Sequence, residues 1–144
     1  MPIEILLVED NLGDVRLIKE ALLDASDFVR INRVSDGLQA VAFLRQKGEY
    51  TAAPRPDLIL LDLNLPIMDG REVLATIKKD EGLKSVPVFI VTSSEIVADI
   101  TLADQYPATR FHRKPIQWDG FASLARDISD LWRVKDRSPL LQKR

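Results

Sequence analysis

Residues 56–66 read PDLILLDLNLP, in which four consecutive apolar residues, 58–61, end at an acidic residue, Asp62. An apolar run of this length, flanked by Asp57 and Asp62 with Pro56 just upstream, is typical of a short strand that is buried on both faces. Strands of this kind occur in parallel sheets that are covered by helices on both sides. The stretch therefore indicates an α/β protein with Asp62 at the carboxyl end of one strand.

The segments on either side alternate between strand-like and helix-like patterns. Strands are expected at residues 3–8, 28–34, 58–61, 86–91 and 109–113, and helices at 14–25, 37–46, 70–79, around 96–103 and at 118–132. In the helix around 96–103, Ile96, Ile100 and Ala103 are expected to face the core, because they share one helical face. Strict alternation favours one five-stranded parallel sheet with helices on both faces.

Length and composition restrict the function classes. The 144 residues are enough for one domain, expected at 1–132, followed by a tail at 133–144. With 20 basic and 22 acidic residues, the chain has no general attraction for nucleic acid. It has no cysteine and one histidine, which excludes thiolate and multi-histidine metal sites. No apolar run approaches a membrane span and no secretion signal begins the chain, so a cytoplasmic protein is expected.

Charged and polar residues follow four of the expected strands. Glu9 and Asp10 follow the first strand, Asp62 the third and Lys114 the fifth, while Thr92 ends the fourth. Because the carboxyl ends of parallel strands share one edge, these side chains are expected to lie together. Two like charges about 4 Å apart repel by roughly 4 kcal/mol at an effective dielectric near 20, so the acids need counter-charges. Lys114 would supply one and Mg²⁺, which prefers oxygen ligands, the other.

This grouping suits phosphoryl transfer to a carboxylate. Asp62 would accept the phosphoryl group, and Asp10 would hold the metal ion together with Asp62. Thr92 would donate a hydrogen bond to one phosphoryl oxygen, and Lys114 would pair with another. In the turn before the helix at 70–79, Gly70 is expected to free the backbone, so that Asn64 presents its carbonyl oxygen to the metal ion.

In combination these residues resemble the receiver domain of two-component response regulators. The shared motifs are VED at 8–10, DLILLD at 57–62, MDG at 68–70, VTS at 91–93 and KP at 114–115, and the resemblance covers about residues 3–132. It implies a flavodoxin-like fold, a Mg²⁺ requirement and phosphotransfer from a sensor histidine kinase to Asp62. It also implies Glu9 and Asp10 as the acidic pair, and a switch made of Thr92 and Phe111. Any catalysis would be limited to the protein's own phosphorylation and dephosphorylation, so no separate enzyme activity is expected.

The chain is also similar to a narrower group, the single-domain regulators that partner cyanobacterial phytochromes. The similar stretches are 11–17, 54–66, 69–74 and the late pair at 131–132. This similarity implies a light-sensing, phytochrome-type kinase as phosphodonor. Two positions depart from the usual receiver pattern, since Glu9 is one methylene longer than the common aspartate and Phe111 lacks a hydroxyl. The segment 106–109, YPAT, replaces the usual Gly-Ala before the fifth strand.

The resemblance further implies a stand-alone signalling protein. We expect a homodimer through the helix around 96–103, the strand at 109–113 and the last helix, and an unidentified downstream protein partner. Cross-subunit ion pairs would join Arg110 and Arg113 to Asp99 and Asp104. An apolar set in the tail would extend this contact; it comprises Trp132, Val134, Leu140 and Leu141.

Three other interpretations remain open at this point. A receiver-like module that acts without phosphorylation is compatible with Glu9 and Phe111. A haloacid-dehalogenase-type phosphatase is less favoured, because Asn64 stands where such enzymes place their acid. A transcription factor is disfavoured, because no helix-turn-helix follows. His112 is expected to be an ordinary strand residue.

Overall fold

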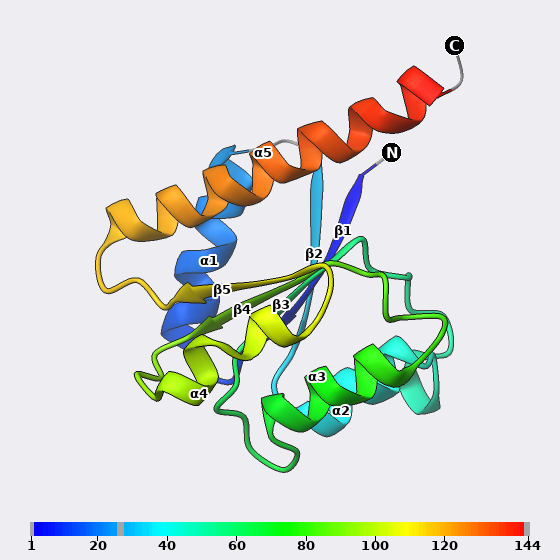
Figure 1. Ribbon diagram of the computed structural model, residues 1–144, viewed down its shortest axis with the longest axis vertical. Coiled ribbons are helices and arrows are strands. Elements are labelled where there is room, and N and C mark those ends of the chain that lie inside the picture. Colours follow the sequence, from blue (N-terminus) through cyan, green and yellow to red (C-terminus); the bar gives the residue numbers. More distant parts are fainter. Residues whose placement is uncertain (1, 26–27, 143–144) are drawn as a thin grey trace.

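The computed structural model describes residues 2–25 and 28–142, which form one parallel sheet with helices on both faces (Figure 1). The strands are β1 (Ile3–Val8), β2 (Val29–Val34), β3 (Leu58–Leu61), β4 (Val88–Thr92) and β5 (Thr109–Arg113). Their order in the sheet is β2-β1-β3-β4-β5, and every neighbouring pair is parallel. The predicted fold class is confirmed, and β1, β3 and β5 have the predicted bounds.

The helices are α1 (Leu12–Ala25), α2 (Gly37–Leu44), α3 (Gly70–Lys79), α4 (Val97–Ile100) and α5 (Trp118–Gln142), with 3-10 turns η1 (Gly48–Tyr50) and η2 (Leu102–Gln105). Side chains just before three of them satisfy free backbone N–H groups, and before α2 the Asp36 side chain accepts from the amide of Gln39. The Asn11 side chain accepts from the amide of Asp14 at 3.0 Å, so α1 begins earlier than predicted. Asp69 caps α3 in the same way by accepting from the amide of Arg71.

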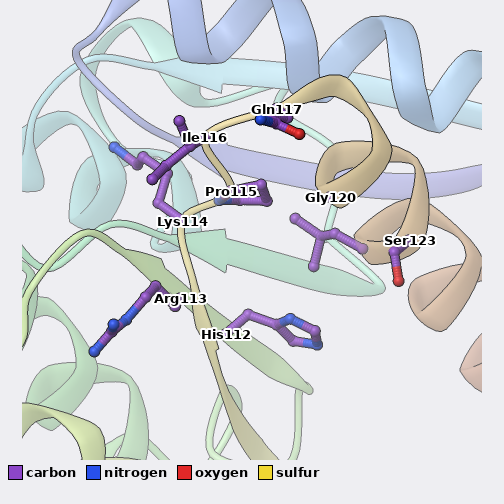
Figure 2. Close-up of a pocket in the computed structure, with 9 residues that line it drawn as sticks. His112, Arg113, Lys114, Pro115, Ile116, Gln117, Gly120 and Ser123 are labelled. Carbon is purple, nitrogen blue, oxygen red and sulfur yellow. The ribbon is translucent and has the colours of Figure 1, made fainter.

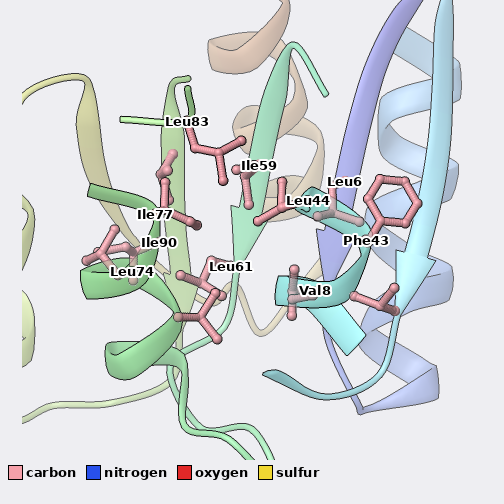
Figure 3. Packing of buried hydrophobic residues seen from close by; sticks show 14 of the residues in the cluster. Leu6, Val8, Phe43, Leu44, Ile59, Leu61, Leu74, Ile77, Leu83 and Ile90 are labelled. Carbon is pink, nitrogen blue, oxygen red and sulfur yellow. The ribbon is translucent and has the colours of Figure 1, made fainter. Parts of the chain in front are cut away.

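Two apolar cores lie on opposite faces of the sheet, because successive side chains of a strand point to opposite faces. One core, below α1 and α5, contains Ile5, Leu7, Leu60, Phe89, Phe121 and Ile128. The other, below α2 and α3, contains Leu6, Val8, Ile59, Leu61, Leu74 and Ile90 (Figure 3). Since β3 supplies both cores with fully buried residues, its carboxyl end is held from both sides.

The region between β4 and β5 differs from the prediction. The expected helix is one turn of α4 followed by η2, and Ile96 and Ile100 are exposed while Ala103 is buried. Helical spacing had placed all three on an inward face, but the turn is too short to lay that face on the sheet. In its place, Leu102 and Ala103 pack against the core below α2 and α3.

At the other end of the chain, α5 continues through Gln142, past the end predicted at residue 132. The side chains of Trp132, Val134, Leu140 and Leu141 lie outside the described residues, so the dimer contact expected there stays a prediction. Among the helices that the structure describes, none is both long and apolar enough to cross a membrane.

Candidate functional site

The acidic residues predicted to share one edge of the sheet do lie together. Carboxylate oxygens of Glu9, Asp10 and Asp62 are within 4.8 Å of one another. Glu9 and Asp10 follow β1 and Asp62 follows β3, and these two strands are neighbours in the sheet. Glu9 and Asp62 are buried, whereas Asp10 is exposed. The site thus combines two carboxylates shielded from water with a third at its rim.

Lys114, which follows β5, reaches into this group and supplies the counter-charge that the sequence predicts. Its Nζ lies 2.7 Å from Oε1 of Glu9 and 3.2 Å from Oδ2 of Asp62. A third ion pair, at 2.9 Å, joins Lys114 to Oδ2 of Asp14 in α1. Asp14 was not among the predicted site residues. The sequence does carry a signal for Asp14: it lies about one helical turn after Asp10, in the first turn of α1, which begins beside the site.

Burial and close charges shift two pKa values at the site. Burial is the main reason that the pKa of Glu9 rises to about 7, and the nearby charge of Asp62 adds to this effect. Burial alone would lower the pKa of Lys114, but hydrogen bonds to Glu9 and Asp14 and the charge of Asp62 raise it above its ordinary value. Lys114 is therefore a permanent cation at neutral pH.

The loop after β1 is held by a second cation that sequence reasoning missed. Nε of Arg33 in β2 donates to the carbonyl of Glu9 at 3.0 Å, and its Nη2 donates to the carbonyl of Asp10 at 3.3 Å. The amide of Asn11 donates to Oε2 of Glu9 at 3.1 Å. These bonds fix the direction of both acids, and they depend on the pairing of β1 with β2.

Gly70 is required at the site for a reason other than the predicted one. A Cβ atom there would lie 2.2 Å from the carbonyl oxygen of Asp62 and 2.6 Å from Cα of Leu63. The residue of this loop with a positive φ, 70°, is Ile67. Gly70 therefore lets α3 approach the chain beside Asp62, and it does not supply unusual backbone freedom.

Thr92 is fully buried at the end of β4, and its hydroxyl has two donors in reach. The Asn64 side-chain amide and the backbone amide of Ser94 each lie 3.4 Å from its Oγ1. The backbone amide of Asn64 also donates to Oδ1 of Asp62 at 3.2 Å. Asn64 thus links the carboxylate to the hydroxyl, while the metal-binding role predicted for its carbonyl oxygen stays a prediction.

The two aromatic residues of β5 point to opposite faces of the sheet. Phe111 is half-buried against the core below α2 and α3. His112 stacks on Phe89, with ring centroids 5.8 Å apart, and its Nε2 lies 3.5 Å from Asp127 of α5. His112 therefore behaves as an ordinary strand residue, as expected.

One part of the predicted set of cross-subunit charge pairs is wrong, the part that involves Asp99, while a pair of Arg110 or Arg113 with Asp104 stays a prediction. Asp99 was expected to form a pair across a subunit interface, but it is buried within the chain against Arg71 of α3. Arg113 lies 3.6 Å from Glu95 of the same chain, and the guanidinium of Arg110 lies over the Phe89 ring at 6.0 Å. Sequence spacing could not identify the partner of Asp99, because Arg71 is 28 residues away.

An open cavity of about 560 Å³ lies beside the site, between the end of β5 and the start of α5 (Figure 2). His112, Pro115, Ile116 and Leu124 are among its lining residues, none of which is acidic. Figure 2 shows the Lys114 side chain directed away from His112. The acidic cluster of Glu9, Asp10 and Asp62 therefore lies outside this cavity, at another part of the same sheet edge.

Comparison with known proteins identifies the family. Residues 5–125 match the family model described as the response regulator receiver domain, so the chain belongs to that family. The response regulator Rcp1 of Synechocystis sp. is 41% identical over 131 residues, which are 91% of this chain and 89% of Rcp1. The phosphatase alternative is set aside by this match.

Solved structures agree with the family assignment. The Mn²⁺-bound form of Rcp1 has a TM-score of 0.83 at 42% identity, over 91% of this chain and 94% of that one. The phosphorylated cyanobacterial phytochrome response regulator RcpA has a TM-score of 0.85 at 43% identity, over 92% and 94%. The chain is therefore a response regulator related to the phytochrome response regulators.

Proposed function

We propose that the protein accepts a phosphoryl group on Asp62 from a histidine kinase, with a divalent cation bound among the acidic residues. The observation that carries this proposal is the buried Asp62 carboxylate, which lies 3.2 Å from the Lys114 ammonium within the acidic cluster. One cation among Glu9, Asp10, Asp14 and Asp62 leaves negative charge in excess. A site of this kind is suited to a further cation and to an incoming phosphoryl group.

The donor set fits a hard divalent ion. Glu9, Asp10 and Asp62 offer carboxylate oxygens within 4.8 Å of one another, and Mg²⁺ takes oxygen ligands while it keeps several waters. We assign Mg²⁺ to these three residues and to the backbone carbonyl of Asn64, and the Mn²⁺-bound form of Rcp1 supports a divalent ion. When bound, such an ion neutralises charge on the phosphoryl oxygens.

The residues of this chain have separate roles in the transfer. A carboxylate oxygen of Asp62 attacks the phosphorus of a phosphohistidine, a P–O bond forms and the P–N bond breaks, and the electron pair of that bond returns to the imidazole. Lys114 then pairs with a phosphoryl oxygen, exchanging part of its contact with Asp62. The Thr92 hydroxyl donates to another phosphoryl oxygen.

The signal leaves the site through Thr92 and Phe111. When the Thr92 hydroxyl moves towards the phosphoryl group, space opens behind it, and the half-buried Phe111 moves inward. This movement changes the face formed by α4, β5 and α5, through which the protein forms a homodimer or contacts a downstream protein. A shift from about 1% to about 99% active needs roughly 5.5 kcal/mol.

A phytochrome-type kinase is the proposed donor. The support is the relationship to RcpA, a cyanobacterial phytochrome response regulator, and the surface around the site. Leu12, Ile67 and Ile116 follow three of the strands that end at the site and are exposed. Exposed aliphatic side chains beside a reactive carboxylate suit a protein donor better than a small molecule.

Phosphorylation can be tested by intact-mass measurement after incubation with acetyl phosphate and MgCl₂. We expect the wild-type protein to gain one phosphoryl group, Asp62→Asn to gain none, and Asp24→Asn, an exposed change in α1, to behave as wild type. Labelling of Asp62→Ala by a purified kinase would contradict the proposal. A wild-type protein that takes up no label from acetyl phosphate or from any of several kinases would favour the phosphorylation-independent module.

A further inference from the structure

Helix α4 is attached to the rest of the protein by a polar anchor. Its apolar residues Val97 and Ile100 are 72% and 36% exposed, and Ile96 before them is 62% exposed. Asp99 is the one buried residue of α4. A single helical turn without a buried apolar face gains little from the hydrophobic effect. The position of α4 therefore depends on what Asp99 binds.

Asp99 binds the guanidinium of Arg71 at the start of α3. Nε of Arg71 donates to Oδ1 of Asp99 at 2.7 Å and Nη2 donates to Oδ2, so the pair is bidentate. Nη1 of the same guanidinium lies 2.9 Å from Oδ2 of Asp69. The pair thus joins α4 to α3, which is itself fixed by fully buried apolar residues.

The same carboxylate is connected to the switch hydroxyl. Ser94 Oγ donates to Oδ2 of Asp99 at 2.6 Å, and the backbone amide of Ser94 lies 3.4 Å from Oγ1 of Thr92. A continuous chain of polar contacts therefore runs from Arg71 through Asp99 and Ser94 to Thr92. Chains of this kind respond as a unit when one member is removed.

We propose that Arg71 and Asp99 are positioning residues, which hold Ser94 and Thr92 in the arrangement described above and so oppose the movement of Thr92 towards a phosphoryl group on Asp62. The proposal rests on the proposed function of Asp62. In physical terms, the ion pair stabilises the arrangement in which the Thr92 hydroxyl accepts from Ser94 and Asn64. Removal of the pair lowers the free energy needed to leave that arrangement.

The ion pair is charged under the conditions in which it would act. The hydrogen bonds from Arg71 lower the pKa of Asp99 below its ordinary value, against the opposing effect of burial. At neutral pH both partners are therefore ionised, and the anchor is fully formed when the protein meets its phosphodonor.

The test compares the binding of beryllium fluoride with MgCl₂, a phosphoryl analogue, by isothermal titration calorimetry. The proteins are the full-length wild type, Asp99→Asn, Arg71→Gln and the double variant. We expect each single variant to bind the analogue about threefold to tenfold more tightly, and the double variant no more tightly than the singles. Arg16→Gln, which removes an exposed ion pair in α1, is the matched control and should leave the affinity unchanged.

Equal or weaker affinity in the single variants would overturn the proposal. This includes variants that melt at a lower temperature but bind the analogue no more tightly than the wild type. A second measurement needs no analogue. The amide NMR shifts of Thr92 and Ser94 should change in Asp99→Asn, and amide exchange in α4 should accelerate; unchanged shifts would also overturn it. If the wild type fails to bind the analogue, the failure lies with the proposed function of Asp62, while the NMR shifts still decide the positioning role.

Discussion

Helices α3 and α4 both begin just after site residues, but they are held in opposite ways. Three residues of α3, Val73, Leu74 and Ile77, are completely buried, whereas the buried residue of α4 is charged. Buried apolar side chains are closely packed, so they cannot be rearranged without loss of contacts. A partly buried ion pair, whose arginine side chain is 35% exposed, can be exchanged for water and other partners more easily than an apolar core can be repacked. Helix α3 is therefore the fixed side of the site, and α4 is the side that can move.

The largest expected effect is on α3. Leu74→Ala should lower the free energy of unfolding by about 2–5 kcal/mol, because it leaves a cavity in a core that lies between α3 and the sheet. Urea denaturation would measure this change. Ile100→Ala in α4 is the matched variant and should change the stability by less than about 0.5 kcal/mol, since Ile100 is exposed. Similar losses in both variants would contradict the distinction between the two helices.

A second large effect is expected where α3 meets the site. Gly70→Ala should destabilise the protein by about 1–3 kcal/mol, because its Cβ would collide with the backbone at Asp62 and Leu63. The same change should weaken the binding of beryllium fluoride, since it displaces Asp62. The control is Gly82→Ala, whose Cβ would lie 3.4 Å from the Asp80 side chain. If Gly70→Ala were as stable as the wild type, the start of α3 and the backbone at Asp62 and Leu63 would have to separate easily.

A smaller effect is expected for the anchor of α4. Asp99→Asn should lower the free energy of unfolding by about 1–2 kcal/mol at pH 7, less than for a fully buried pair because the Arg71 side chain is 35% exposed. Since folding lowers the pKa of Asp99, its ionic stabilisation is present above the ordinary aspartate pKa near 4 and is lost as the pH falls through the lowered value.

The difference between wild type and Asp99→Asn should therefore be constant from about pH 5 to 8 and shrink below about pH 4. Thermal unfolding across this range would measure it. A difference that grows on acidification would show that the carboxylate is not the stabilising species.

The smallest effect is expected for the exposed ion pair of α1. Arg16→Gln should change the stability by no more than about 0.5 kcal/mol, because the side chains of Arg16 and Glu20 are 81% and 51% exposed and the pair is screened by solvent. Urea denaturation at low and high salt would measure this. A loss of stability as large as that of Asp99→Asn would mean that the Arg16–Glu20 and Arg71–Asp99 pairs contribute equally despite their different burial.

Most of the fold followed from local patterns. The bounds of β1, β3 and α3 agree with the sequence prediction, because each has an apolar pattern that matches its burial. The start of the fourth strand was predicted too early, at Val86, since β4 begins at Val88, directly after Pro87, which has no backbone N–H donor. At α4 the pattern was misleading, because helical spacing defines a face and does not say whether anything covers it.

The order of strands and helices along the chain, and the acidic, hydroxyl and amine groups at the strand ends, could be predicted from the sequence alone, since these depend on residues that are close in the chain. The folded structure was needed to show that Lys114 reaches Asp14 as well as Glu9 and Asp62, and that Asp99 lies against Arg71. The physical reason is that a buried charge takes whatever opposite charge the packing brings near it. That neighbour is set by the strand order β2-β1-β3-β4-β5 and the placement of the helices, and not by spacing along the chain.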